Sequence, residues 1–323
     1  MGSTPDNNDY DMVIVGAGPA GMASAIYGSR MGWKTLVLEK EAVGGLAAVT
    51  PIIENYPGFS EITGLEFADK LRKQAEKFGT EIRELVEVTD IKTNQAPLEL
   101  VTTSGNFTAK VIVLATGTSH RHLNIPGEKE FEAKGVSYCA TCDGPLYKSK
   151  KVAVVGGGNS AVTEALYLDN VVREVYLIHR RDRLRAEDSL QKEILNNSKV
   201  NFIWDSEVTE IHGSEVGGIR KISIKNNKTG EINDLRVKAI FIAIGILPNN
   251  ELAKKIGVKL TEEGLIKVDA KQRTNIPRIY ACGDITPGQG QISVAVGEGT
   301  TAAISAFLDM RGGDWYGIET SNG

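Results

Sequence analysis

The feature that most constrains this chain is a glycine-rich turn that occurs twice, each time directly after a short apolar run. In the first copy, residues 11–15 (DMVIV) precede GAGPAG, which has the spacing G-x-G-x-x-G. In the second copy, residues 151–155 (KVAVV) precede GGGNSA. A strand, a glycine turn, a helix and a second strand within about 30 residues form a βαβ unit that binds a dinucleotide. The sequence therefore predicts two related nucleotide-binding domains.

In the first copy, each glycine has a separate task. Gly16 allows the tight turn, Gly18 lets the backbone approach a pyrophosphate, and Gly21 allows the helix to pack closely on the strand. The helix start offers free N–H groups and a positive dipole end to the phosphates. Glu39, about 20 residues further on, is expected to accept hydrogen bonds from ribose hydroxyls. The simpler alternative is a turn that only packs a helix on a sheet.

The second copy differs at the end of its second apolar run, residues 174–178, where no acid follows. The run is followed by His179, Arg180 and Arg181, with Arg185 close behind. Guanidinium groups at this position suit a 2′-phosphate, so the sequence predicts a preference for NADPH over NADH. The alternative is a solvated basic face. The turn and helix residues expected to contact the cofactor are Gly157, Gly158, Asn159, Ser160 and Ala161.

Two dinucleotide sites of different type point to FAD together with NADPH. That pairing moves electrons from a hydride donor, through a flavin, to a third group. Cys139 and Cys142 supply a candidate for this group, because two intervening residues allow a disulfide and the motif commonly lowers one thiol pKa. Asp143 follows directly and is a candidate general acid for a departing thiolate. The sequence thus predicts a redox-active dithiol.

The competing interpretations of the dithiol are half of a zinc site and an inert buried pair. A structural zinc site needs two more ligands, usually from a second nearby pair. Cys282 is distant, and no two of the four histidines have the usual spacing of such a pair. We therefore expect no metal. Cys282 follows an apolar strand and is expected in the core, whereas Asp284 is a candidate ligand of a flavin ribityl hydroxyl; surface or linker positions are expected for His120 and His122.

Composition narrows the function further. The 323 residues suffice for two domains of roughly 100–200 residues each. A net charge of −4 gives no field for nucleic acid, and no run approaches the about 18 apolar residues of a membrane span. The polar start lacks the pattern of a signal peptide, and three cysteines are too few for a disulfide-stapled secreted protein. We therefore expect a cytoplasmic protein without a nucleic-acid or membrane partner.

Together these residues resemble the low-molecular-weight thioredoxin reductases of bacteria and archaea, over about residues 10–310. The most specific motif is CATCDGP at 139–145. Further similar segments are GAGPAG at 16–21, GG at 44–45, ENYPG at 54–58, GGGNSA at 156–161, HRRDRLRA at 179–186 and Gly283-Asp284.

The resemblance implies an α/β fold with two Rossmann-like dinucleotide-binding domains of three layers (ββα). The FAD domain would comprise 1–117 and 246–323, and the inserted NADPH domain, 118–245, would carry the dithiol. The resemblance also implies a homodimer that reduces thioredoxin, with Cys142 toward the flavin, Cys139 attacking the thioredoxin disulfide and Asp143 as the acid. Further implied cofactor contacts are Pro19, Ala20, Lys40, Gly45, Leu46, Asn55, Val88, Ala115, Thr116, Gly117, Ile244, Gly245, Gln291, Ile292 and Ser293.

Two departures from the family pattern lie near the expected flavin. Where the family usually has Arg-Gln-Ala, the aligned residues are Gln291-Ile292-Ser293, so a positive charge is missing and the redox poise is expected to change. Gly45 is usually followed by Gln but here by Leu46. These changes leave a second enzyme hypothesis open, with reduced ferredoxin or F420 as donor or another thiol protein as acceptor. A third hypothesis is a non-enzymatic flavoprotein that senses redox state.

Overall fold

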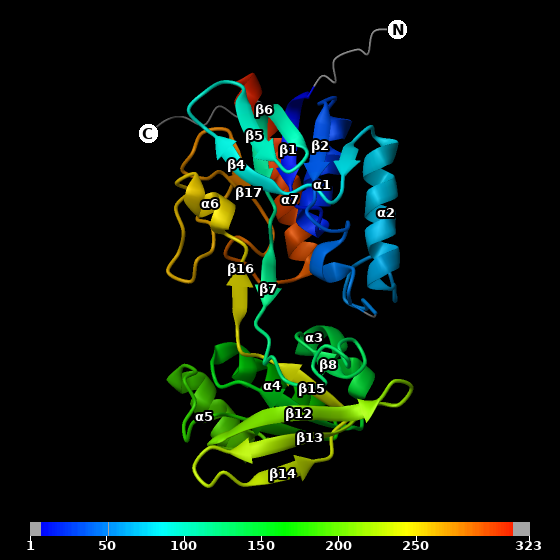
Figure 1. Cartoon of the computed structure of the whole chain (residues 1–323), viewed down its shortest axis with the longest axis vertical. Coiled ribbons are helices and arrows are strands. Elements are labelled where there is room, and N and C mark those ends of the chain that lie inside the picture. Colours follow the sequence, from blue (N-terminus) through cyan, green and yellow to red (C-terminus); the bar gives the residue numbers. More distant parts are fainter. Residues whose placement is uncertain (1–7, 51, 313–323) are drawn as a thin grey trace. The chain divides into compact units, whose positions relative to one another are not determined.

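The computed structural model describes residues 8–50 and 52–312 and divides the chain into two compact units. Unit 1 contains the described residues up to Ser119 and from Pro248 onward, and unit 2 contains His120–Leu247. Figure 1 shows the elements of each unit. In unit 2 a parallel sheet lies between helices and a separate antiparallel sheet, whereas in unit 1 the antiparallel strands continue the parallel sheet and pack on the face opposite the main helices.

The sheet of unit 1 has the strand order β3-β2-β1-β6-β5-β4, with β17 paired to β6. Met12 and Ile14 pack with the helices, whereas Val13 and Val15 pack toward β4 and β5, because successive side chains of a strand point to opposite faces. The parallel strands are β1 (Asp9–Val15), β2 (Thr35–Leu38), β3 (Glu81–Arg83), β6 (Gly105–Leu114) and β17 (Ile279–Ala281); β4 (Val88–Lys92) and β5 (Leu98–Thr102) are antiparallel.

Helices α1 (Pro19–Arg30), α2 (Gly64–Lys77) and α7 (Ile292–Arg311) of unit 1 cover one face of this sheet. A Cβ on Gly299 of α7 would lie only 2.1 Å from the Ala20 carbonyl oxygen of α1, so the two helix backbones nearly touch. Cys282 is fully buried in this layer, which confirms its expected core position, and burial raises the pKa of its thiol to about 12. Unit 1 also contains η1 (Gly45–Ala47) and α6 (Glu251–Lys255), whose Ala253 packs on the opposite face of the sheet.

Unit 2 has an entirely parallel sheet of order β11-β10-β9-β15-β8. Its strands are β8 (Val136–Ser137), β9 (Lys151–Val155), β10 (Glu174–Ile178), β11 (Asn201–Ile203) and β15 (Ala239–Ile242). The helical side has α3 (Ala140–Asp143), η2 (Gly144–Tyr147), α4 (Asn159–Val171) and α5 (Asp188–Asn197); the antiparallel layer has β12 (Ser206–Ser214), β13 (Gly218–Asn226) and β14 (Ile232–Leu235).

The chain crosses between the units twice, through β7 (Thr118–His120) and β16 (Ile246–Pro248), which pair with each other. Helix α1 begins at Pro19, because proline fits the first helical position. Strand β15 ends at Ile242, and the chain turns at Gly245, where φ is +111°. No helix of the described ranges is long and apolar enough to cross a membrane.

Candidate active site

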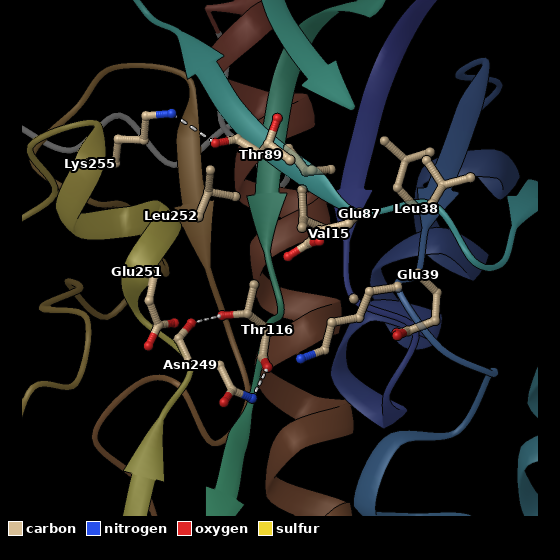
Figure 2. Close-up of a pocket in the computed structure, with 14 residues that line it drawn as sticks. Val15, Leu38, Glu39, Glu87, Thr89, Thr116, Asn249, Glu251, Leu252 and Lys255 are labelled. Carbon is tan, nitrogen blue, oxygen red and sulfur yellow. Dashed lines mark hydrogen bonds between the residues drawn. The ribbon is translucent and has the colours of Figure 1, made fainter. Parts of the chain in front are cut away.

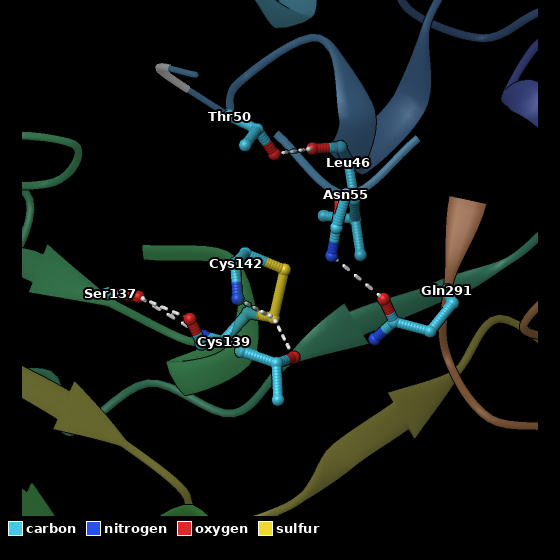
Figure 3. Close-up of a disulfide and its surroundings, with 8 residues drawn as sticks. Leu46, Thr50, Asn55, Ser137, Cys139, Cys142 and Gln291 are labelled. Atoms are coloured by element: carbon cyan, nitrogen blue, oxygen red, sulfur yellow. Dashed lines mark hydrogen bonds between the residues drawn. A yellow bond between two sulfur atoms is a disulfide. The ribbon is translucent and has the colours of Figure 1, made fainter. Parts of the chain in front are cut away.

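Cys139 and Cys142 form a disulfide at the start of α3 (Figure 3). Cys139 is the N-cap residue, and its sulfur accepts a hydrogen bond from the Cys142 N–H at 3.2 Å. The Thr141 hydroxyl lies 3.4 Å from the same sulfur. Hydrogen-bond donors beside a sulfur favour the thiolate over the thiol. Cys139 therefore has the surroundings that a nucleophilic thiolate needs.

Asp143, the last residue of α3, is a largely buried acid beside the dithiol. Burial raises the pKa of its carboxyl, and the nearby Ser137 hydroxyl acts in the opposite direction. Within the described part of the chain, its buried Oδ1 has no hydrogen-bond partner. The Ser137 hydroxyl also accepts a hydrogen bond from the Cys139 N–H at 3.2 Å. A carboxyl with a raised pKa keeps its proton to higher pH, which suits an acid that protonates a departing sulfur.

In unit 1, the turn between β1 and α1 has no room for larger residues at two of its glycines. A Cβ on Gly16 would lie 2.3 Å from the Ala115 carbonyl oxygen, and a Cβ on Gly21 would lie 1.9 Å from the Gly16 carbonyl oxygen. Around Gly18 the space is open, so a ligand can approach its backbone. Because α1 has no side-chain cap, the N–H groups of its first turn are available to an anion.

A pocket of about 320 Å³ lies at the carboxyl ends of β1, β2 and β6, where open α/β sheets bind ligands (Figure 2). The Glu39 carboxylate accepts hydrogen bonds from the Ala17 N–H at 2.7 Å and from the Glu41 N–H at 2.9 Å. It therefore lies against the glycine turn, at the entrance that a nucleotide ribose would use. Five residues from the sequence prediction line this pocket: Gly16, Glu39, Lys40, Val88 and Thr116.

The opposite wall of this pocket is formed by four residues that no sequence motif marks: Asn249, Glu251, Leu252 and Lys255 (Figure 2). The Thr116 hydroxyl donates to the Asn249 carbonyl oxygen at 2.8 Å, across 133 residues of sequence. The Asn249 amide donates back to the Thr116 carbonyl oxygen, also at 2.8 Å. No local motif can reveal such a wall.

The other residues expected at a flavin lie in unit 1 but outside the pocket lining. A Cβ on Gly45 would lie 3.3 Å from Gly18 Cα, so these two turns touch. The Asn55 amide donates to the Gln291 side-chain oxygen at 3.2 Å (Figure 3). The remaining positions are Pro19 and Ala20 at the start of α1, Leu46 in η1, Ala115 and Gly117 after β6, Gly283 and Asp284 after β17, and Ile292 and Ser293 at the start of α7.

In unit 2, the turn after β9 has the same construction. A Cβ on Gly157 would lie 2.3 Å from the His179 ring, whereas the space around Gly158 is open. Helix α4 begins at Asn159 without a side-chain cap, and the Asn159 amide donates to the Glu187 carboxylate at 2.9 Å. Ser160 and the buried Ala161 follow in the first turn of α4, and Ile244 and Gly245 lie just beyond the carboxyl end of β15.

The basic segment lies directly beside this second turn. The backbone N–H of Arg185 donates to the Gly157 carbonyl oxygen at 2.6 Å. The side chains of Arg180, Arg181 and Arg185 are exposed. His179 is buried, and its Nε2 has no partner among the described residues. Burial lowers the His179 pKa, and the Arg185 charge lowers it further. This arrangement offers exposed guanidinium groups to a phosphate beside a neutral imidazole.

His120 lies at the end of β7, where the chain crosses from unit 1 to unit 2, which agrees with the expected linker position. Its ring is partly buried and stacks on Tyr138 at 4.6 Å, and burial lowers its pKa. His122 is exposed, with Nδ1 2.8 Å from the Tyr138 hydroxyl, which donates to Glu128 at 2.9 Å. Because Tyr138 directly precedes Cys139, this cluster attaches the dithiol segment to the start of unit 2.

Comparison with known proteins identifies the family. The family model described as pyridine nucleotide-disulphide oxidoreductase matches residues 10–299. The thioredoxin reductase of Bacillus subtilis (strain 168) is 40% identical over 302 residues, which cover 92% of this chain and 93% of that protein. The chain belongs to the thioredoxin reductases of the pyridine nucleotide-disulphide oxidoreductase family. The thioredoxin reductase of Streptomyces coelicolor is also 40% identical, over 92% of both chains.

Solved structures of thioredoxin reductases have the same fold. The Streptococcus pyogenes MGAS5005 enzyme is 39% identical, has a TM-score of 0.90, and covers 95% of this chain and 100% of its own. The Giardia duodenalis enzyme is 34% identical with a TM-score of 0.87, over 94% of this chain and 99% of its own. These matches confirm the α/β fold with two Rossmann-like domains. Thioredoxin reductases of this family use FAD and NADPH, as the two different glycine turns predicted.

Proposed function

We propose that this thioredoxin reductase transfers hydride from NADPH to FAD, then two electrons to the Cys139–Cys142 disulfide, and finally to the disulfide of thioredoxin. One observation carries this proposal: the disulfide lies at the start of α3, next to the largely buried acid Asp143. A structural disulfide needs no acid next to it. The two glycine turns, one beside Glu39 and one beside the arginines, suit the two cofactors that would bring electrons to this disulfide.

Unit 1 fits FAD and unit 2 fits NADPH. In unit 1 the open backbone at Gly18, the uncapped start of α1 and the pocket at Glu39 suit a pyrophosphate and an unphosphorylated ribose. In unit 2 the open backbone at Gly158 and the exposed guanidinium groups suit a pyrophosphate and a 2′-phosphate. When bound, the flavin accepts a hydride and passes two electrons on.

The residues of α3 then carry out thiol–disulfide exchange. The Cys139 thiolate attacks one sulfur of the thioredoxin disulfide, which forms a mixed disulfide and releases the other thioredoxin sulfur as a thiolate. Asp143 gives its proton to that departing sulfur. The Cys142 thiolate next attacks the Cys139 sulfur, which re-forms the intramolecular disulfide and releases the second thioredoxin sulfur. Two electrons have then passed to thioredoxin, together with the one proton from Asp143; the second thioredoxin sulfur leaves as a thiolate and takes its proton from solvent.

We also propose that the protein is a cytoplasmic homodimer. Unit 1 exposes several large apolar side chains within one stretch of sequence: Leu46, Val49, Phe59 and Leu65. Exposed apolar side chains that cluster are typical of protein interfaces. A cytoplasmic location suits a chain whose only paired cysteines have a redox role, because that compartment keeps other thiols reduced. The mass in solution, measured by light scattering, tests the dimer.

Anaerobic titration of the FAD-loaded protein with NADPH and NADH in parallel tests the electron donor. We expect NADPH to bleach the flavin at much lower concentration than NADH, because the guanidinium groups of unit 2 recognise the 2′-phosphate. An equal response to both nucleotides would contradict the assignment of the arginines. If reduced ferredoxin or F420 bleached the flavin and neither nucleotide did, the electron donor would not be NADPH. The basic segment of unit 2 does not favour this alternative.

Asp143→Asn is expected to slow reduction of thioredoxin by about 10²-fold while the protein still accepts hydride, because the amide N–H is not acidic enough to protonate a departing sulfur. The pKa of Asp143 is raised, so the acid is active at low pH and loses its proton as the pH rises through that pKa. Stopped-flow rates of the dithiol half-reaction should therefore fall with rising pH in the native protein. In Asp143→Asn this fall should be absent, and a fall that persists would assign it to another group.

A further inference from the structure

The turn that follows β17 is held by Glu298, a residue of α7 outside every motif in the sequence. One carboxylate oxygen of Glu298 accepts hydrogen bonds from the Gly283 N–H at 2.7 Å and from the Thr286 hydroxyl at 3.1 Å. The Gly283 carbonyl oxygen in turn accepts from the Thr286 N–H at 2.8 Å, which closes a four-residue turn. The Thr286 hydroxyl also donates to the Gly283 carbonyl oxygen at 2.8 Å, so Glu298 holds the Gly283 end of the turn directly and shares the Thr286 hydroxyl with the turn itself.

The turn leaves two polar groups of Asp284 without protein partners. Among residues 8–50 and 52–312, neither its backbone N–H nor its carboxyl makes a hydrogen bond. Asp284 is partly buried, and burial raises the pKa of its carboxyl. Polar groups withdrawn from water cost free energy unless a partner satisfies them. A ligand with one acceptor and one hydroxyl donor would satisfy both groups.

Close backbone packing fixes Glu298 in place. A Cβ on the adjacent Gly299 would lie 2.1 Å from the Ala20 carbonyl oxygen, and a Cβ on Gly283 would lie 2.7 Å from the Ala20 Cβ. The Ser24 hydroxyl donates to the Gly299 carbonyl oxygen at 2.8 Å. Helix α7, the turn after β17 and the start of α1 therefore meet at Ala20, directly after the glycine turn that suits a pyrophosphate.

We propose that Glu298 is a positioning residue for FAD. It holds the turn 283–286 so that the Asp284 N–H and carboxyl remain available to the flavin nucleotide, beside the start of α1. This inference rests on the proposed FAD site of unit 1. Glu298 acts through the turn and does not contact the reacting atoms. Its removal should therefore change the affinity of the protein for FAD.

The test compares FAD binding to the apoprotein of three variants, followed by flavin fluorescence. Glu298→Ala removes the acceptor and leaves the Gly283 N–H unsatisfied, so we expect FAD affinity to fall about tenfold or more. Glu298→Gln keeps a side-chain oxygen that accepts from the same N–H and should rescue affinity to within about threefold of the native value. The melting temperature of each apoprotein is recorded in parallel.

Asp309→Ala is the matched control, because Asp309 also lies on α7 and accepts a hydrogen bond from Tyr280 of β17 at 2.6 Å. We expect this variant to lower the melting temperature of the apoprotein and leave FAD affinity unchanged. Equal loss of affinity in Asp309→Ala, native affinity in Glu298→Ala, or no rescue by Glu298→Gln would each overturn the inference. Failure of the native apoprotein to bind FAD would instead refute the proposed function.

Discussion

Replacing Cys142 by serine is expected to abolish thioredoxin reduction, by about 10³-fold or more, while NADPH still bleaches the flavin. The variant cannot form the intramolecular disulfide that receives electrons, and the two cysteines act as one unit, so little partial activity should remain. Hydride acceptance uses the two nucleotide sites and needs neither cysteine. Rapid-reaction spectroscopy of flavin reduction, beside a steady-state thioredoxin assay, separates the two steps.

The two single cysteine variants should differ in whether they form a stable mixed disulfide with thioredoxin. In Cys142→Ser, the sulfur of Cys139 keeps both of its neighbouring donors, the backbone N–H of residue 142 and the Thr141 hydroxyl. After it attacks oxidised thioredoxin, Cys139 should therefore remain in a mixed disulfide with that protein. In Cys139→Ser the same mixed disulfide should not accumulate. Cys282→Ser is the control, because that thiol is fully buried and takes no part. Thioredoxin reduction retained in Cys142→Ser would refute the mechanism, and capture by Cys142 would reverse the two roles.

Replacing Arg180 and Arg181 together by alanine is expected to raise the KM for NADPH by about 10²-fold or more and to leave the KM for NADH nearly unchanged. Each guanidinium is expected to make a charge-assisted contact of about 1.5–3 kcal/mol with the 2′-phosphate, which NADH lacks. Steady-state kinetics with both nucleotides measure the ratio directly. The effect on NADPH should also weaken as salt rises, because both side chains are exposed.

Arg220→Ala provides the control for this double variant, because Arg220 is also an exposed arginine of unit 2 but lies on β13 in the antiparallel layer. It should leave both KM values unchanged. If the KM values of the double variant rose equally for NADH and NADPH, the arginines would have a structural role in the segment that contacts the Gly157 carbonyl oxygen. If neither KM value changed, the basic segment would be a solvated face without a role in nucleotide binding.

Much of the fold and the dithiol was predictable because the relevant signals are local. The apolar runs before Gly16 and Gly156 predicted β1 and β9, since a buried parallel strand followed by a glycine turn has few alternatives. The spacing of Cys139 and Cys142 predicted a disulfide, which the structure contains. These features depend on residues within one turn or one βαβ unit of each other, so chain connectivity alone brings them together.

Contacts between distant segments were decided only by the folded chain. The pocket wall at Asn249, the hold of Glu298 on the turn at Gly283, and the stacking of His120 on Tyr138 all join residues on separate elements. Such contacts depend on how helices and strands pack, and packing is set by close approaches such as that of Gly299 to Ala20. The linear order of residues therefore identified the chemistry of the dithiol and the two nucleotide turns, and tertiary packing determined which other side chains support them.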